Sequence, residues 1–291
     1  MSQAPTATVV FTTYNQPEWL EKVLLGFAAQ SRLDFEVIVA DDGSGEDTGA
    51  VIERLRPSLP YPLLHLWQPD RGFRKCEALN RAIGASRSDY LIFTDGDCIP
   101  RRDFVATHLR LRAPGRFLSG GYHKLPMATS RAISAADIAS GHCFDLAWLH
   151  AQGMPASRRD LKLAAGPRLG WLLDLLSPAR ASWNGHGASG WKQDLLAVNG
   201  FDERMRYGGQ DREFGERLVN AGLRGKRIRH RTVALHLDHP RGYATAESIA
   251  FNRQLRAQTR RSRRTWTEHG IEKQPQPALA PPLAWAPEAA R

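Results

Sequence analysis

Short apolar segments alternate with segments of helical periodicity through the first hundred residues, and this alternation limits the fold more than any other feature. The apolar segments are rich in β-branched residues and have the length of single strands; they cover residues 8–12, 35–40, 63–67 and 90–94. Segments with helical spacing lie between them, at residues 18–30, 47–55 and 76–86. Strands separated by crossover helices run parallel, so the pattern predicts an α/β fold with a mostly parallel sheet flanked by helices.

Polar residues follow directly after three of these strands, where open parallel sheets bind their ligands. They form the segments 12–15 (TTYN), 41–44 (DDGS) and 95–97 (DGD). Two carboxylates separated by one small residue, such as Asp95 and Asp97, are able to face one hard cation. Oxygen ligands of this kind suit Mg²⁺ or Mn²⁺, which also bridge diphosphate oxygens. The competing interpretation is a plain turn, because Asp-Gly is a favoured turn pair.

The carboxylates after the second strand also have two interpretations. A carboxylate at Asp42 is able to accept a hydrogen bond from the imide N–H of uracil or from a ribose hydroxyl. Equally, the segment suits the start of a helix, with Ser44 or Asp47 as the cap. The chain has no P-loop lysine pattern and no GxGxxG fingerprint, which argues against a kinase or a dehydrogenase.

The rest of the chain has weaker patterns. We expect a helix at 101–112, a strand at 117–122, an insertion or helical lid at 147–182 and a second ordered region at 194–239, with a strand near its end at 233–237. The segment after Lys273 is rich in Pro and Ala, and we expect it to be disordered.

The formal net charge is +10, and six arginines are concentrated between Arg253 and Arg264. Such an excess attracts anions: nucleic acid, an acidic membrane leaflet or phosphorylated substrates. A predicted helix at 249–266 contains the arginines, and it is either a solvated face or a basic helix that touches an anionic membrane. No zinc finger, RRM signature or helix-turn-helix pattern accompanies the charge, so nucleic acid is an unfavoured partner.

The three cysteines lie far apart, at positions 76, 98 and 143, and no CxxC pair occurs. This spacing indicates neither a disulfide framework nor a zinc knuckle, and a reducing, cytoplasmic setting fits it. The sequence opens without the apolar segment of a signal peptide, and no apolar run has the length of a bilayer-spanning helix.

Four segments in a fixed order carry a family resemblance: TTYNQPEWL, ADDGS, RGFRKCEALNRAIG and FTDGD, all within residues 8–100. They resemble the inverting family 2 glycosyltransferases, which have the Rossmann-like GT-A fold. A second block, residues 199–214 (NGFDERMRYGGQDREF), resembles the C-terminal module of galactosyltransferase-like members. Bacterial polysaccharide and lipopolysaccharide glycosyltransferases carry similar blocks.

The resemblance implies one GT-A domain over residues 1–273. Within it we expect a nucleotide-binding half at 6–100, a donor and acceptor half at 101–240 with a helical insertion, and a basic C-terminal helix at 241–273. Residues 274–291 form the expected disordered tail.

The resemblance also implies how a nucleotide-sugar donor is held. Tyr14 would stack on uracil, and Asp42 would bind the base or ribose with support from Asp41. One or more of three basic residues after the third strand would lie near the phosphates. The full set of implied donor-binding residues is Thr12, Tyr14, Asp41, Asp42, Arg71, Arg74, Lys75, Asp95 and Gly96.

Asp211 is the implied catalytic base, which deprotonates the acceptor hydroxyl. Many relatives have Glu-Asp where this chain has Gln210-Asp211, so one candidate base is removed. The competing interpretation is a helix N-terminus that favours acidic residues because of the helix dipole. The residues implied to contact the donor or acceptor sugar are Trp183, Asn184, Gly209, Gln210 and Glu213. The stretch around Trp183 is equally well interpreted as an ordinary Gly-rich loop.

The implied metal ligands are Asp97 and Asp95, with Asp97 the closer, and a histidine that follows the base-bearing helix. Either His236 or His239 has the expected position, and imidazole suits Mn²⁺. Because alternate residues of a strand point to opposite faces, we expect only one of the two histidines to bind.

The resemblance therefore implies a metal-dependent inverting hexosyltransferase that uses Mn²⁺ or Mg²⁺. The donor would be a nucleotide-sugar, with UDP favoured, and the acceptor a glycan or lipid-linked glycan of cell-surface polysaccharide or lipopolysaccharide synthesis. We expect the enzyme in the cytoplasm, with peripheral contact at an anionic membrane. Two alternatives stay open: a nucleotide-sugar-binding module without turnover, and a basic nucleic-acid-binding protein.

Overall fold

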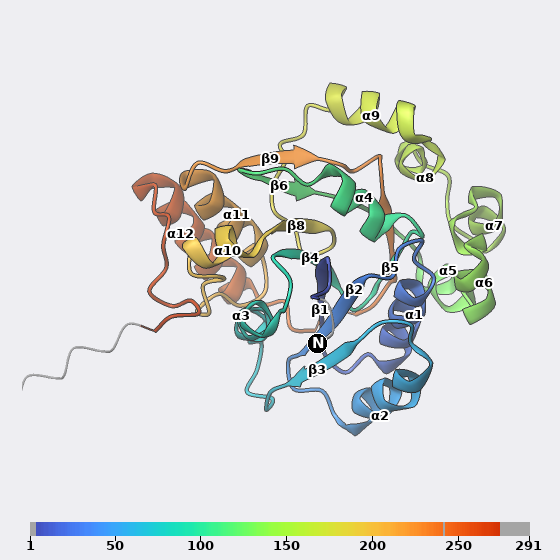
Figure 1. Cartoon of the computed structure of the whole chain (residues 1–291), viewed down its shortest axis with the longest axis horizontal. Coiled ribbons are helices and arrows are strands. Elements are labelled where there is room, and N and C mark those ends of the chain that lie inside the picture. The colour runs from blue at the N-terminus through green and yellow to red at the C-terminus, as the bar shows by residue number, and fades with distance from the viewer. Residues whose placement is uncertain (1–3, 241, 274–291) are drawn as a thin grey trace, which may run out of the picture.

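A twisted seven-stranded sheet forms the centre of the protein (Figure 1), in the order β3-β2-β1-β4-β8-β6-β9. The computed structural model describes residues 4–240 and 242–273. The strands of this sheet are β1 (Ala7–Thr13), β2 (Phe35–Asp41), β3 (Leu63–Trp67), β4 (Tyr90–Asp95), β6 (Arg116–Ser119), β8 (Ala188–Trp191) and β9 (Arg224–Arg227). A second sheet has the order β5-β10-β7, with β5 at Cys98–Pro100, β7 at Gly121–Lys124 and β10 at Val233–His236.

The predicted parallel sheet is confirmed. β1 pairs in parallel with both β2 and β4, and β2 pairs in parallel with β3. Only β8 runs antiparallel to its neighbours in this sheet, β4 and β6. The carboxyl ends of β1, β2 and β4 therefore meet at one edge, where the segments 12–15, 41–44 and 95–97 lie side by side.

Alternating apolar side chains of the strands form a core on each face of the sheet. Val9 and Phe11 of β1 pack in the core that contains α1 (Pro17–Ala28), whereas Val10 packs in the core of the opposite face. The first core also contains residues of α2 (Glu46–Leu55) and α4 (Phe104–Leu111). The second core collects α3 (Lys75–Ala85), α10 (Lys192–Ala197), α11 (Gln210–Asn220) and α12 (Ala246–Ser262).

Two local predictions are wrong. The expected strand at 117–122 is divided between β6 and β7, which belong to different sheets. The chain changes sheet at Gly120, where a Cβ atom would lie 2.5 Å from the carbonyl oxygen of Gly187. Helix α2 has no side-chain cap, because its N-cap residue is Gly45. Of the two predicted caps, Asp47 lies within the helix, and Ser44 accepts a hydrogen bond from the backbone N–H of Asn15.

The predicted insertion is helical and extends further than expected. It contains α5 (Met127–Ala132), α6 (Ala135–Ser140), α7 (Leu146–Ala151), α8 (Leu161–Ala164) and α9 (Pro167–Leu176). Single 3₁₀ turns lie at η1 (Arg56–Ser58), η2 (His142–Phe144) and η3 (Arg158–Asp160). Ile138 and Leu149 join the core under α1, so the first part of the insertion is an integral layer of the fold.

Helix α9 is anchored by its small and polar residues rather than by its leucines. Buried Asp174 accepts hydrogen bonds from the backbone N–H of His230 and from Nε of Arg231, both at 3.1 Å. A Cβ atom on Gly170 would lie 2.3 Å from the carbonyl oxygen of His230, so glycine permits this close approach. Five large apolar side chains of this helix are 41–69% exposed; we call Leu169, Trp171, Leu172, Leu175 and Leu176 the exposed face of α9.

Among residues 4–240 and 242–273, no helix has both the length and the apolar character needed to cross a membrane. The predicted basic helix at 249–266 is α12, which begins and ends a few residues earlier. The tail expected to be disordered, 274–291, lies outside the described residues.

A buried histidine under the central sheet leads to a prediction about stability. His108 of α4 is fully buried, and its Nδ1 lies 2.7 Å from Oγ of Ser189. Burial lowers the pKa of His108 to about 3. Because the unfolded chain takes up a proton near pH 6.5 and the folded chain does not, stability is greatest above that pH and is lost as the pH falls toward 3. We expect the free energy of unfolding to decrease by about 2 kcal/mol between pH 7 and pH 5 from this group.

Urea unfolding at the two pH values measures this change, with His108→Gln as the variant that retains a polar side chain but does not titrate. The decrease should be smaller in the variant by about 2 kcal/mol. An identical decrease in both proteins would contradict the assignment.

Candidate active site

A glycine fixes the turn that separates the two carboxylates of the DGD segment. The backbone N–H of Gly96 donates to the carbonyl oxygen of Thr12 at 2.8 Å. A Cβ atom at position 96 would lie 2.6 Å from that same oxygen, so a larger residue does not fit. Asp95, the last residue of β4, and Asp97 lie on either side of Gly96 in the chain. Their carboxylates consequently have different neighbours.

Asp97 is surrounded by histidines. Its Oδ2 lies 2.9 Å from Nε2 of His239 and 3.8 Å from Nε2 of His236. The two imidazole rings are stacked, with centroids 5.6 Å apart. The expectation that the histidines face opposite sides is therefore wrong, because β10 ends at His236. The backbone N–H of the next residue, Leu237, donates to the carbonyl oxygen of Asp97. This hydrogen bond keeps the chain beside Asp97, so His239 also reaches its carboxylate.

The donor atoms around Asp97 fit a divalent cation. Nδ1 of His236 is buried and has no hydrogen-bond partner within residues 4–240 and 242–273, and ligand atoms of Asp97, Cys98 and His236 lie within 4.8 Å of one another. Burial opposes ionisation of Asp97, but the hydrogen bond from His239 and the charge of His236 lower its pKa to about 2. Burial raises the pKa of the Cys98 thiol well above its usual value, so this sulfur stays protonated. Carboxylate and imidazole ligands of this kind suit Mn²⁺.

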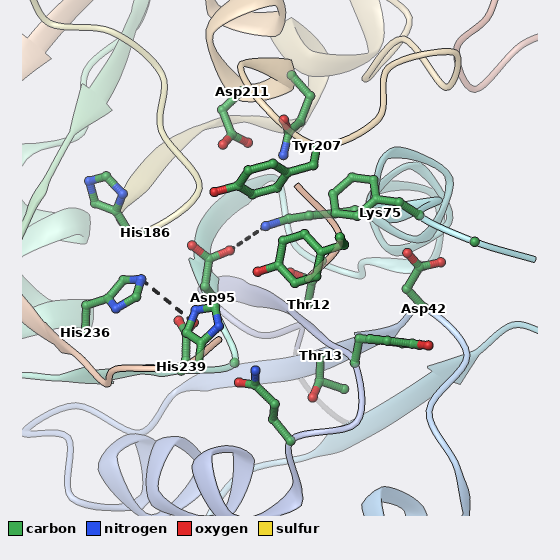
Figure 2. A pocket seen from close by; sticks show the side chains of 18 of the residues that line it. Thr12, Thr13, Asp42, Lys75, Asp95, His186, Tyr207, Asp211, His236 and His239 are labelled. Carbon is green, nitrogen blue, oxygen red and sulfur yellow. Dashed lines mark hydrogen bonds and ion pairs between the residues drawn. The ribbon is translucent and has the colours of Figure 1, made fainter. Parts of the chain in front are cut away.

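Asp95 has a cation of its own. Nζ of Lys75, in the first turn of α3, donates to Oδ1 of Asp95 at 2.6 Å (Figure 2). Burial opposes the charge of Lys75, but the carboxylates of Asp95 and Asp211 raise its pKa above the usual range. The predicted metal ligand Asp95 is thus joined to lysine, whereas Asp97 is joined to the two histidines.

Asp211 lies in the first turn of α11, above Asp95 in Figure 2. Its Oδ1 is buried and has no hydrogen-bond partner within the described residues. Burial raises the pKa of Asp211 to about 6, with Asp95 contributing and Lys75 opposing. A Cβ atom on Gly185 would lie 3.1 Å from Oδ2 of Asp211 and 3.2 Å from Oδ1 of Asp95. The space between the two carboxylates therefore remains open because residue 185 is glycine.

Asp42 and Asp41 have different roles in the loop after β2. Oδ1 of Asp42 accepts from Nε2 of Gln68 at 2.7 Å, and Oδ2 accepts from the backbone N–H of Arg74 at 2.8 Å. Asp41 is fully buried and accepts from the backbone N–H of Ser44. Asp42 lines the first cavity described below, whereas Asp41 stabilises the loop after β2 through its hydrogen bond to the backbone of Ser44.

One cavity of about 410 Å³, the first cavity, brings most of the predicted residues together (Figure 2). The predicted residues that line it are Thr12, Tyr14, Asp42, Lys75, Asp95, Gly96, Asp97, Gln210, Asp211, His236 and His239. A second cavity of about 320 Å³ adjoins it, and Asp211, Tyr122 and His186 line both. Asn184 and Gly209 line the second cavity only.

Two predicted phosphate-binding residues line neither cavity. Arg71 lies outside them, and the guanidinium of Arg74 lies 3.1 Å from the carboxylate of Glu77. Of the three basic residues proposed for this role, Lys75 alone reaches the first cavity.

Two predicted sugar-contacting side chains belong to the core. Trp183 borders the second cavity, but its indole is fully buried and packs against Phe93, Phe117 and Phe214. Glu213 is fully buried as well, and both its oxygens accept hydrogen bonds from Nε of Arg217 at 3.0 Å. Glu213 lines neither cavity and has no exposed surface for a sugar, so that prediction is wrong. Contact between Trp183 and a sugar stays a prediction, because Trp183 borders the second cavity.

An aromatic wall of the first cavity was not predicted. Phe73, Tyr207 and Tyr243 line it, and their ring centroids lie 4.9–6.0 Å apart. Phe73 and Tyr207 lie within the two blocks that carried the resemblance, so the sequence holds a signal for both. Tyr122 and His186 line the cavity as well, and their rings lie 4.2 Å apart. His186 belongs to the Gly-rich stretch after Trp183, whereas Tyr122 had no functional signal in the sequence.

Comparison with known proteins agrees with this geometry. The family described as glycosyl transferase family 2 matches residues 8–111, and the family described as N-terminal domain of galactosyltransferase matches residues 185–240. With the parallel sheet, these matches identify the class: the protein is a glycosyltransferase with a GT-A fold. The predicted resemblance to family 2, followed by a galactosyltransferase-like block, is thereby confirmed.

Relatives in bacteria are similar over most of the chain. An uncharacterized glycosyltransferase of Bacillus subtilis, YfnE, is 27% identical over 84% of this chain and 68% of its own length. A validoxylamine A glucosyltransferase of Streptomyces hygroscopicus is 28% identical over 76% of this chain. Chondroitin synthase of Escherichia coli is 23% identical over 80% of it. The chain spans 53% of the Streptomyces protein and 35% of the synthase.

Solved structures share the fold. The mannosyltransferase PcManGT of Pyrobaculum calidifontis, in complex with GDP-Man and Mn²⁺, has a TM-score of 0.56 at 20% identity and covers 83% of this chain and 59% of its own. TarS of S. aureus has a TM-score of 0.58 at 15% identity, covering 87% of this chain and 39% of its own.

Proposed function

We propose that this protein transfers a sugar from a nucleotide diphosphate sugar to an acceptor hydroxyl, with inversion at the anomeric carbon. One observation carries the proposal: a single cavity contains Asp42, the Lys75–Asp95 pair, the Asp97–histidine cluster and Asp211. These groups suit, in turn, a nucleoside, a diphosphate with its cation, and the deprotonation of a hydroxyl.

Asp211 is the proposed base. Asp211 lines both cavities, and its Oδ1 has no hydrogen-bond partner among the described residues. Its raised pKa of about 6 makes it a stronger base than an exposed carboxylate. Gln210 lies beside it in the first turn of α11, and its Oε1 accepts from the backbone N–H of Gly208 at 3.0 Å. The amide therefore holds the loop that presents Asp211, and Asp211 is the group left to take the proton.

The nucleotide would lie at the opposite end of the first cavity. Asp42 would bind the base or ribose, Tyr14 would stack on the base, and Lys75 would lie near the diphosphate. UDP is the proposed nucleotide. TarS has been solved with UDP-GlcNAc, and PcManGT with GDP-Man, so GDP is the comparison to test.

Asp97, His239 and His236 would hold Mn²⁺ or Mg²⁺, with Mn²⁺ favoured by the imidazole nitrogens. The bound cation would stabilise the negative charge that develops on the leaving diphosphate. The protein residues would supply the rest: Asp97 fixes the position of the cation, and Asp95 orients Lys75.

The proposed acceptor is a glycan or a lipid-linked glycan in the synthesis of cell-surface polysaccharide. The support comes from relatives such as chondroitin synthase. We propose that the reaction takes place in the cytoplasm, at the inner face of the membrane.

Membrane contact is better supported at α9 than at the arginine-rich α12. Leu255 of α12 is buried in the core, and Arg256 and Arg260 both pair with Glu216. The exposed face of α9, in contrast, has large apolar side chains, and Arg158, Arg159, Arg168 and Arg180 are exposed close to it in the chain. Apolar side chains flanked by cations suit an anionic bilayer surface.

For the base, we expect Asp211→Asn to bind UDP normally and to lower kcat by about 100- to 10,000-fold, because a general base contributes this much. Turnover of a UDP-sugar panel and calorimetry with UDP measure the two properties. Asp137→Asn, on the distant helix α6, is the matched control. Full transfer by Asp211→Asn would remove this residue from the role.

For the metal, Asp97→Ala should abolish the Mn²⁺-dependent part of UDP binding, because the carboxylate is the central oxygen ligand. Calorimetry with and without Mn²⁺ measures this difference. Cys98→Ala should retain metal-dependent binding, since the proposed ligands are the carboxylate of Asp97 and the imidazoles of His236 and His239. Equal affinity of Asp97→Ala and wild type in Mn²⁺ would refute the site.

For the membrane, we expect the double variant Leu172→Glu, Leu176→Glu to lose about tenfold in affinity for phosphatidylglycerol vesicles, because it removes buried apolar area and adds repulsion. Flotation measures the bound fraction, and Arg253→Gln in α12 should change it little. If the double variant floats like wild type, or instead converts a dimer to a monomer in light scattering, the exposed face of α9 does not bind membrane.

A further inference from the structure

The second cavity would give an acceptor access to the proposed base Asp211, and this role rests on the proposed function. This cavity lies beyond the first one, and the two share Asp211, Tyr122 and His186. Its volume of about 320 Å³ lies in the range of small-ligand sites. A nucleotide-sugar in the first cavity would leave it free for the acceptor.

Three cations line the second cavity, whereas Asp211 is its one carboxylate. They are Lys162, Arg212 and Arg229. None of the three forms an ion pair with any residue that the structure describes. Lys162 donates to the carbonyl oxygen of Tyr122 at 3.0 Å, and Arg229 donates to that of Arg180 at 3.1 Å. Both cations are therefore held in place by carbonyl groups, and neither charge is neutralised by a directly paired carboxylate among the described residues.

These cations repel one another. Burial lowers the pKa of Lys162, and the charges of Arg229 and Arg159 lower it further. Burial likewise lowers the pKa of Arg229, and the charges of Arg227 and Arg212 add to the effect against the opposing carboxylate of Asp174. His186, which lines both cavities, is neutral because burial lowers its pKa to about 4. An anion that enters this space would relieve the repulsion, whereas a neutral ligand would not.

Two hydrogen-bond acceptors in the same cavity have no partner in the part of the chain that the structure describes. Asn184 donates from Nδ2 to Oγ of Ser119 and to the carbonyl oxygen of Gly120, both at 3.3 Å, while its Oδ1 is buried and unsatisfied. Oδ1 of Asp211 is unsatisfied as well. Unsatisfied acceptors in a cavity suit the hydroxyl groups of a sugar, which donate hydrogen bonds.

We propose that the second cavity binds an acceptor sugar that carries a negatively charged group, a phosphate or a carboxylate. Its hydroxyls face Asp211 and Asn184, and its anionic group lies against Lys162 and Arg229. Arg212, which follows the base in α11, adds positive charge at the same side. The cavity thereby selects charged acceptors over neutral ones of the same size.

Binding of three sugars to the full-length protein, saturated with UDP and Mn²⁺, tests the proposal. Glucose 6-phosphate carries the phosphate, glucuronate carries the carboxylate, and glucose is the neutral reference. Calorimetry should show at least one charged sugar binding about tenfold or more tightly than glucose, with an affinity that falls as salt is added. Which charged sugar binds more tightly identifies the kind of anion.

Lys162→Met and Arg229→Met should each reduce this affinity about tenfold, because each removes a charge and retains an aliphatic chain. Arg168→Met is the matched control: it removes the same charge from exposed α9, lines neither cavity, and should have no effect. Thermal melting shows that each variant is folded. The salt dependence of the wild-type protein gives the same test without any substitution.

Equal affinity for glucose and both charged sugars would overturn the proposal, as would failure of both charged sugars to bind at millimolar concentration. Weaker UDP binding in Lys162→Met or Arg229→Met, with unchanged sugar binding, would instead assign these cations to the donor. If UDP itself does not bind to the wild-type protein, the proposed function fails, and that result is distinguishable from failure of the acceptor proposal.

Discussion

The hydrogen bond from Gly96 to the carbonyl oxygen of Thr12 is the contact on which the site depends. It joins the ends of β1 and β4 at the edge of the sheet, and only glycine permits the two backbones to approach this closely. Asp95 is thereby directed to Lys75 and Asp97 to the two histidines. A DGD tripeptide in a free turn would allow both carboxylates to point the same way. Here the close contact between β1 and β4 directs the two carboxylates to different partners.

The first hundred residues could be predicted well because each element there has a local signal. The strand at 63–67 was located to the residue, and β1, β2 and β4 to within one residue at each end. The signal is weaker where tertiary contacts decide. Nothing in the run from Phe117 to Tyr122 shows that Gly120 must approach Gly187 and that the chain changes sheet there. The exposed face of α9 could not be predicted either, since Asp174 becomes an anchor only when His230 and Arg231 are placed beside it.

The site residues divide in the same way. Asp42, Asp97 and Asp211 follow recognisable motifs, and the fold brings them to one cavity. Trp183 and Glu213 lie in equally recognisable blocks, yet their side chains stabilise the core: the indole fills the space between Phe93 and Phe214, and Glu213 neutralises buried Arg217. A motif shows that a residue type matters, but burial decides whether it matters for packing or for ligands. His236 and His239 were expected on opposite faces of a strand, yet both approach Asp97. The reason is that β10 ends at His236, so strand alternation does not extend to His239.

Gly185 leaves a gap beside the carboxylates of Asp95 and Asp211 that any other residue would narrow. A Cβ atom at position 185 would lie 3.1 Å from Oδ2 of Asp211 and 3.2 Å from Oδ1 of Asp95, so even alanine would press against both acids. The loop that leads into β8 contributes main chain alone at this point. Access to the two acids therefore changes only when the backbone of that loop moves, since no side chain at position 185 can rotate to open or close the gap.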